Sequence, residues 1–150
     1  MAISRARRPI MLVAMAAFAL LLAFSLVASL AASSASAADP RVRDLVIRSI
    51  TINPQTKVAT ARGTVTCTGA QSVQVFVEAS QTVGRLNTVT ALGEKEVRCD
   101  GRVRFSVRLR NVDGRLGPGD ADVDAEAVAC GAEMCFFDEF FGVLPVTKAG

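Results

Sequence analysis

The chain has 150 residues and a formal net charge of +3, and it contains no histidine, tryptophan or tyrosine. This length suits one domain with a modest hydrophobic core. Without histidine, and without a nucleophile elbow or a phosphate-binding loop, the common acid, base and nucleophile sets have no members. We therefore expect a protein that is not an enzyme and that uses no cofactor.

The first 38 residues have the pattern of a secretory signal peptide. Three arginines precede an apolar run from Ile10 to Leu30, and the small residues Ser36 and Ala38 stand where a signal peptidase cleaves. We expect a signal helix in 1–38 and a secreted, extracellular domain over 39–150, with no stable membrane insertion after cleavage. The alternative is a protein anchored by an uncleaved N-terminal helix, because the apolar run of 21 residues is long enough to span a bilayer.

The surplus of positive charge belongs to this signal segment. Three of the 17 basic residues lie in it, so residues 39–150 contain 14 basic and 14 acidic residues. Binding to a phosphate backbone requires a basic surplus, net or local. The balance of charge predicts no nucleic-acid partner for the mature domain.

Apolar and polar residues alternate with a period of two along most of the domain, which indicates β-strands. The clearest case is RVRFSVRLR at 102–110, where apolar residues face one side and mostly arginines face the other. No segment after residue 38 keeps a helical period over three turns. In chain order we predict strands at 45–52, 63–69, 72–80, 87–92, 96–99, 102–110, 120–130 and 142–147, separated by turn residues.

About seven short strands with one-sided apolar faces predict an all-β fold. The arrangement that fits them best is an antiparallel immunoglobulin-like β-sandwich with two disulfides. A true antibody-type domain is disfavoured, because the chain has no tryptophan to pack on a disulfide and no tyrosine for a corner.

Two of the predicted strands carry charges of opposite sign on their polar faces. Asp120, Asp122, Asp124 and Glu126 recur at every second residue, about 7 Å apart along one face. Calcium needs oxygens that converge on one point, so we interpret this run as a solvated face and expect no metal site. Arginines at 98, 102, 104, 108 and 110 form the other face. If the two strands lie in opposite sheets, the outer surfaces of the domain have opposite signs.

The four cysteines all follow the signal segment, and an even number in an exported chain indicates two disulfides. Three pairings are possible. We favour Cys67–Cys99 with Cys130–Cys135, because the short interval of the second pair suits a hairpin that brings its β-carbons into range. A zinc site is the competing use of four cysteines, but the lack of histidine and the irregular spacing disfavour it.

Four of the eight phenylalanines stand together near the C-terminus, in CFFDEFFG at 135–142. If the last two cysteines face each other across a hairpin, Phe136 and Phe140 lie opposite alanines of the preceding strand. Large rings against a small-residue face fill a core layer.

Regular alternation would put the other two rings on the opposite surface and would turn Asp138 inward. We therefore expect a bulge or a single helical turn in this segment. We also predict a small apolar binding site with an acidic rim there, formed by Phe137, Phe141, Asp138 and Glu139.

The stretches GTVTCTG, VRCDG and GPGDADVDAEAVACGAEMC, between Thr51 and Cys135, carry a resemblance. The chain resembles the small secreted immunoglobulin-like proteins of actinobacteria, most of which have no assigned activity. Its short disulfide hairpin is similar to that of the neocarzinostatin-type chromophore-carrying apoproteins. The chain departs from those carriers in lacking a second short disulfide hairpin, because Cys67 and Cys99 are 32 positions apart.

We expect a non-enzymatic secreted module with a binding or structural role, whose contacts lie at the C-terminal hairpin and the phenylalanine cluster. Its partner would be an extracellular protein or an apolar ligand that no residue identifies. Two alternatives stay open. One is a secreted protease inhibitor that presents Gly131 to Met134 as a disulfide-braced loop, and the other is a carrier of a small apolar ligand.

Overall fold

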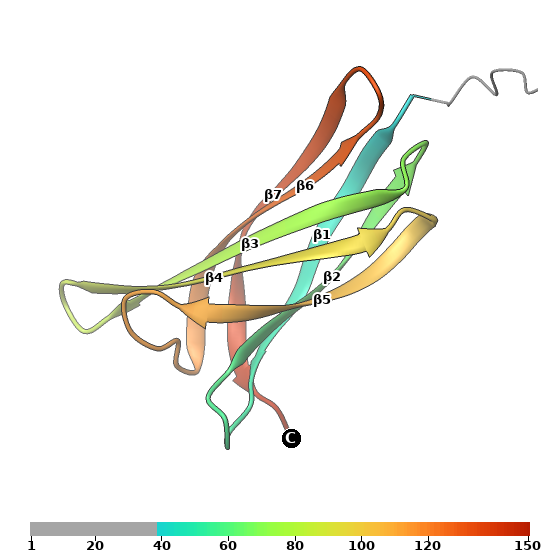
Figure 1. The fold of residues 1–150 in the computed structure, drawn as a ribbon. Coiled ribbons are helices and arrows are strands. Elements are labelled where there is room, and N and C mark those ends of the chain that lie inside the picture. Colours follow the sequence, from blue (N-terminus) through green and yellow to red (C-terminus); the bar gives the residue numbers. More distant parts are fainter. Residues whose placement is uncertain (1–38) are drawn as a thin grey trace, which may run out of the picture. The chain divides into compact units, whose positions relative to one another are not determined.

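A computed structural model describes residues 39–150, so the predicted signal segment lies outside the described residues. The described part forms seven β-strands and no helix (Figure 1). The strands are β1 (Arg41–Ile52), β2 (Ala59–Thr68), β3 (Ser72–Val83), β4 (Asn87–Arg98), β5 (Gly101–Asn111), β6 (Gly119–Cys130) and β7 (Cys135–Lys148). The all-β prediction is confirmed.

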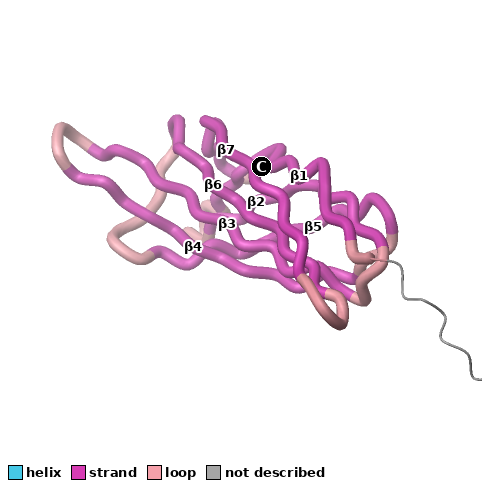
Figure 2. The backbone as a smooth tube through the Cα atoms, turned by 90° about the horizontal axis from the view of Figure 1, so that it is seen from above, coloured by secondary structure: helices cyan, strands magenta, loops and turns pink. Residues whose placement is uncertain are grey.

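The strands close into one barrel in the order β1-β2-β5-β4-β3-β6-β7 (Figure 2). We expected two separate sheets. Long antiparallel ladders join β1, β2 and β5 into one group and β4, β3, β6 and β7 into another. The two groups then meet at both edges, which turns the expected open sandwich into a barrel.

Both junctions between the groups are short. Strands β1 and β7 run parallel and pair only where Ile50–Ile52 meets Val146–Lys148. Strands β4 and β5 pair only at Ala91 and Leu92, although a tight turn connects their other ends. Closure therefore depends on a few backbone hydrogen bonds between residues that are far apart in the sequence.

Two predicted strands, 87–92 and 96–99, are a single strand in the structure. We expected a break between them, but β4 runs without interruption from Asn87 to Arg98. A β-carbon at Gly93 would collide with the backbone carbonyl of Arg108 and would lie 2.6 Å from a methyl group of Val107. Glycine at this position thus allows β5 to approach β4 closely at the short junction.

Two of the turns contain the residue types that such turns require. After β1, the side-chain oxygen of Asn53 accepts hydrogen bonds from the backbone N–H groups of Gln55 and Thr56, each at 2.9 Å. This arrangement is an asparagine-based turn. Gly84, between β3 and β4, has a φ of 71°, a left-handed conformation that favours glycine.

The core consists of the inward-facing residues of all seven strands. On β6 these residues are small, Ala121, Val123, Ala125, Ala127 and Ala129, and all are buried. Larger side chains fill the space opposite, chiefly isoleucines of β1, valines of β3 and Phe105 of β5. A small-residue face on one strand thus makes room for bulky residues on other strands of the barrel.

Both expected disulfides are present. Cys67–Cys99 links β2 to the residue after β4, with 5.2 Å between the α-carbons, at the end of the barrel where β4 and β5 do not pair. Cys130–Cys135 joins two directly opposed residues of the β6–β7 hairpin, with 3.9 Å between the α-carbons. Two disulfides indicate an extracellular or otherwise oxidising environment. Residues 39–150 include no helix of the length and hydrophobicity that crossing a membrane requires.

The charged strands lie on opposite sides of the ring. Going round the barrel from β5 to β6, two strands intervene in one direction and three in the other. The arginine-rich outer face of β5 therefore points away from the acidic outer face of β6. The conditional prediction of two oppositely charged surfaces is met, and the balanced net charge conceals a local basic surplus.

Candidate functional site

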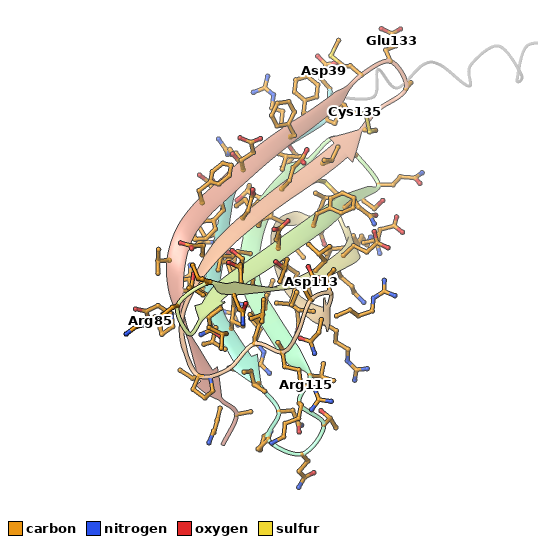
Figure 3. The ribbon with its side chains drawn as sticks, turned by 90° about the vertical axis from the view of Figure 1, so that its left-hand side faces the viewer. Asp39, Arg85, Asp113, Arg115, Glu133 and Cys135 are labelled. Carbon is orange, nitrogen blue, oxygen red and sulfur yellow. A yellow bond between two sulfur atoms is a disulfide. The ribbon has the colours of Figure 1, made fainter. Side chains whose placement is uncertain are left out.

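Strand β7 alternates regularly from Cys135 to Val146, so the expected bulge or helical turn is absent. Phe136 pairs with Ala129, Phe140 pairs with Ala125, and both rings are half-buried. Phe140 packs against the core. Phe137 and Phe141 point outward, and they are 65% and 67% exposed. The hairpin tip lies at the end of the barrel where the described chain begins, as the positions of Glu133, Cys135 and Asp39 show (Figure 3).

Asp138 faces the inner side of β7 and not the side of the exposed rings. Its Oδ2 atom accepts a hydrogen bond of 2.8 Å from the backbone N–H of Leu45 on β1. The two strands have no ladder at this level, because their pairing begins only at Ile50. The N–H group of Leu45 would otherwise have no partner across this junction, and the carboxylate of Asp138 accepts its hydrogen bond. For this reason the inward-facing carboxylate does not require a bulge in β7.

Asp138→Ala should lower the free energy of unfolding by about 1.5 to 3 kcal/mol, because it leaves the half-buried N–H of Leu45 unpaired. Asp138→Asn keeps an acceptor oxygen and should cost less. Urea unfolding of the two variants and the wild type tests the difference. Equal stability of Asp138→Ala and wild type would show that this hydrogen bond does not support the junction.

The exposed rings belong to a wider apolar and acidic surface on the outer side of β7, β6, β3 and β4. Along β7 the outward residues are Phe137, Glu139, Phe141 and Val143, which places the two rings about 14 Å apart with the carboxylate between them. We call this row the β7 stripe. The structure thus brings together three of the four predicted site residues and separates Asp138 from them.

Shallow hollows adjoin the β7 stripe. One lies beside Phe141 and Val143 and is bordered by Glu78, Asp122 and Asp124. The next continues across β3 and β4, where its apolar lining comes from Phe76, Leu92 and Val112, all exposed. These additional residues were not predicted as part of the site. The alternation in SVQVFVEAS did signal that Phe76 and Glu78 face away from the core, but it did not show that β3 lies beside β6.

Carboxylates stand directly opposite one another on this surface. Glu126 of β6 pairs with Glu139 of β7, and Asp124 pairs with Glu78 of β3. Like charges in opposed positions destabilise a sheet. Among residues 39–150 the one ion pair within 4.0 Å joins Arg43 to Asp44, so no basic side chain neutralises these carboxylates at that distance. The one basic residue that lines the two hollows is Arg110, so the surface is mainly acidic and suits a cationic partner.

The loop from Gly131 to Met134 is a tight turn. The N–H of Gly131 donates a hydrogen bond of 2.9 Å to the carbonyl oxygen of Met134, and the adjacent disulfide closes the same hairpin. The backbone is therefore folded back on itself over these four exposed residues.

No three histidine, cysteine, aspartate or glutamate side chains within residues 39–150 lie close enough together to hold a metal ion. The four acidic residues of β6 all point outward along one strand, and all four cysteines are bonded in disulfides.

Comparison with known proteins found no family model that matches the chain and no curated protein with significant similarity to it.

Proposed function

We propose that the protein is a secreted, non-enzymatic binding module of the immunoglobulin-like kind, related to the small actinobacterial proteins that its motifs resemble. The grouping of its strands supports this architecture, because the long ladders divide the strands into two groups, as in a sandwich, and only short pairings join the edges of these groups. The two disulfides and the apolar leader support secretion.

The contact surface that we propose is the β7 stripe with its acidic surroundings. This proposal rests on Phe137 and Phe141, whose side chains are about two-thirds exposed. They lie on the outer face of a regular strand whose other face is turned toward the core. Rings left outside a well-packed core mark interaction sites, and aromatic residues at the centre of an interface contribute much of its affinity. The opposed carboxylates select the partner by charge.

The partner that suits this surface is an extracellular protein with lysine or arginine side chains beside apolar ones. The apolar groups would cover Phe137 and Phe141, while the cations would relieve the repulsion between Glu126 and Glu139 and between Asp124 and Glu78. The arginine-rich face of the protein itself supplies the positive charge that such a partner needs. A second copy of the chain is therefore one partner that the experiment below can detect.

Replacing both outer rings by serine, in Phe137→Ser/Phe141→Ser, should abolish capture of partners from the culture medium of the source organism. Wild type should retain a set of basic proteins that is released by raised salt. Leu86→Ser is the matched control, because Leu86 is 94% exposed at the β3–β4 turn, away from the stripe. Retained proteins are identified by mass spectrometry, and the mass of the unmixed protein at low salt detects self-association.

Retention of the same proteins by wild type and by the double variant would refute the proposal. So would a retained set whose binding does not weaken between low and high salt, because the charge argument requires that it does.

A further inference from the structure

We propose that the basic side of the barrel contains a binding site for a phosphate group, in a hollow over β1, β2 and β5. Four arginines line this hollow, together with Ser49, Gly63, Thr64 and Phe105. They are Arg48, Arg62, Arg102 and Arg104. The site shares no residue with the β7 stripe, although β1 lies next to β7 in the ring.

The register of three strands brings the site together. Thr64 on β2 lies between Val46 of β1 and Arg104 of β5, so it stands at the centre of the outer face. Arg62 is two residues before it on the same side of β2. Neighbouring strands are about 5 Å apart and successive outward residues about 7 Å apart, so long arginine side chains from these positions can meet above Thr64.

An irregularity in β1 supplies another arginine. Ile47 pairs with Gly63 and Ser49 pairs with Arg62, which leaves Arg48 as an extra residue in a bulge. A bulge re-aims a side chain that regular alternation would send elsewhere. Arg48 lies at the edge of the same hollow, opposite the arginines of β5.

The floor of the hollow has a hydrogen-bonding group without a partner. Thr64 is only 6% exposed, and its hydroxyl oxygen makes no hydrogen bond within the described part of the chain. Buried hydroxyls almost always have a partner, so this one is an exception that needs an explanation. An oxygen of a bound anion would accept its proton.

The charges above this hydroxyl are also uncompensated. The ion pair between Arg43 and Asp44 is the one present within 4.0 Å among residues 39–150, and it involves none of the four arginines. Guanidinium groups donate hydrogen bonds in a fork that fits phosphate oxygens. Several donors that approach from three strands suit a tetrahedral anion with several acceptor oxygens better than a planar carboxylate with two.

The phosphate group can belong to free inorganic phosphate or to an extracellular polymer. The sequence predicted no nucleic-acid partner because residues 39–150 have no net positive charge. The arginines on this face form a local basic surplus, so the charge balance no longer excludes a polymer that carries phosphate groups.

Titration of the full chain, labelled with nitrogen-15 and produced in an oxidising compartment, tests the site with inorganic phosphate as the probe. At constant ionic strength in chloride, phosphate should shift the amide resonances of Gly63, Thr64 and Arg104 in a saturable manner. Arg104→Gln should weaken binding about tenfold, since it removes a charge-assisted hydrogen bond, and Thr64→Val should weaken it several-fold. Phosphate should also raise the Tm of Thr64→Val by less than it raises the Tm of the wild type.

Two matched controls lie on the same outer faces but outside the hollow. Thr66→Val on β2 and Arg110→Gln on β5 should bind phosphate as the wild type does. Shifts that do not saturate, or equal affinity in Arg104→Gln and wild type, would overturn the proposal. A parallel titration with a glycerol-phosphate polymer separates the two sources. If the polymer binds more tightly per phosphate group than inorganic phosphate does, the site is assigned to a polymer. If the polymer binds more weakly, the site is assigned to the free anion.

Discussion

Phe105→Ala should lower the free energy of unfolding by about 3 to 5 kcal/mol, because it empties a fully packed position. Phe105 is 7% exposed, and its ring lies against the backbone of Gly63, where an added β-carbon would be 2.6 Å from the ring atom Cζ. Phe140→Ala should cost about 2 kcal/mol, since this ring is half-buried over the alanine face of β6 and beside Gly142. Both losses come from side chains that face the core.

The outer rings should behave differently. Phe137→Ala and Phe141→Ala should each change the free energy of unfolding by less than about 0.5 kcal/mol, because both side chains are already largely in water. Urea unfolding of the four single variants measures the contrast. If the outer rings prove as costly to remove as Phe140, they belong to the core, and the case for a contact surface on the β7 stripe fails.

Loss of the Cys67–Cys99 disulfide should destabilise the barrel by roughly 3 to 4 kcal/mol, from the chain entropy that its 32-residue separation restrains in the unfolded state. In the folded state Cys67 also pairs with Gly101 of β5, two residues beyond Cys99, so the bridge lies beside an existing ladder and the expected loss comes from the unfolded state.

The matched comparison is the Cys130–Cys135 bridge. It spans five positions in a hairpin that is paired along its whole length, so its removal should cost roughly 2 kcal/mol. Denaturant unfolding of the two double cysteine-to-serine variants gives both values. Equal losses, or a larger loss for the short hairpin, would contradict the dependence on loop length from which both values follow.

Local pattern was sufficient to predict most of the strands and the pairing within the last hairpin, but it divided β4 into two strands and began β7 only at Gly142. Alternation identified β5 and β6, and the short cysteine interval fixed the register that places Phe140 opposite Ala125. It also indicated which rings of the cluster would face outward. These features depend on residues close in the sequence, where spacing alone determines geometry.

Features that depend on distant residues were not predictable in this way. The inward Asp138 suggested an irregular strand because its partner, the backbone of Leu45, is 93 residues away. Closure of the barrel rests on short pairings that leave no motif in the sequence. The hollow at Thr64 requires a bulge in β1 and the adjacency of β2 and β5, and neither follows from alternation within one strand.

The β7 stripe and the hollow above Thr64 share no residue, and β1 stands between β7 and β2 in the ring. A small anion held above Thr64 leaves the residues of the β7 stripe free for a macromolecule, so both sites can be filled at once. A barrel occupied in this way is a bivalent connector. If the anion is part of a polymer, many copies of the protein could bind along that polymer, each with its β7 stripe exposed. The combined avidity for a partner would then exceed the affinity of any single contact.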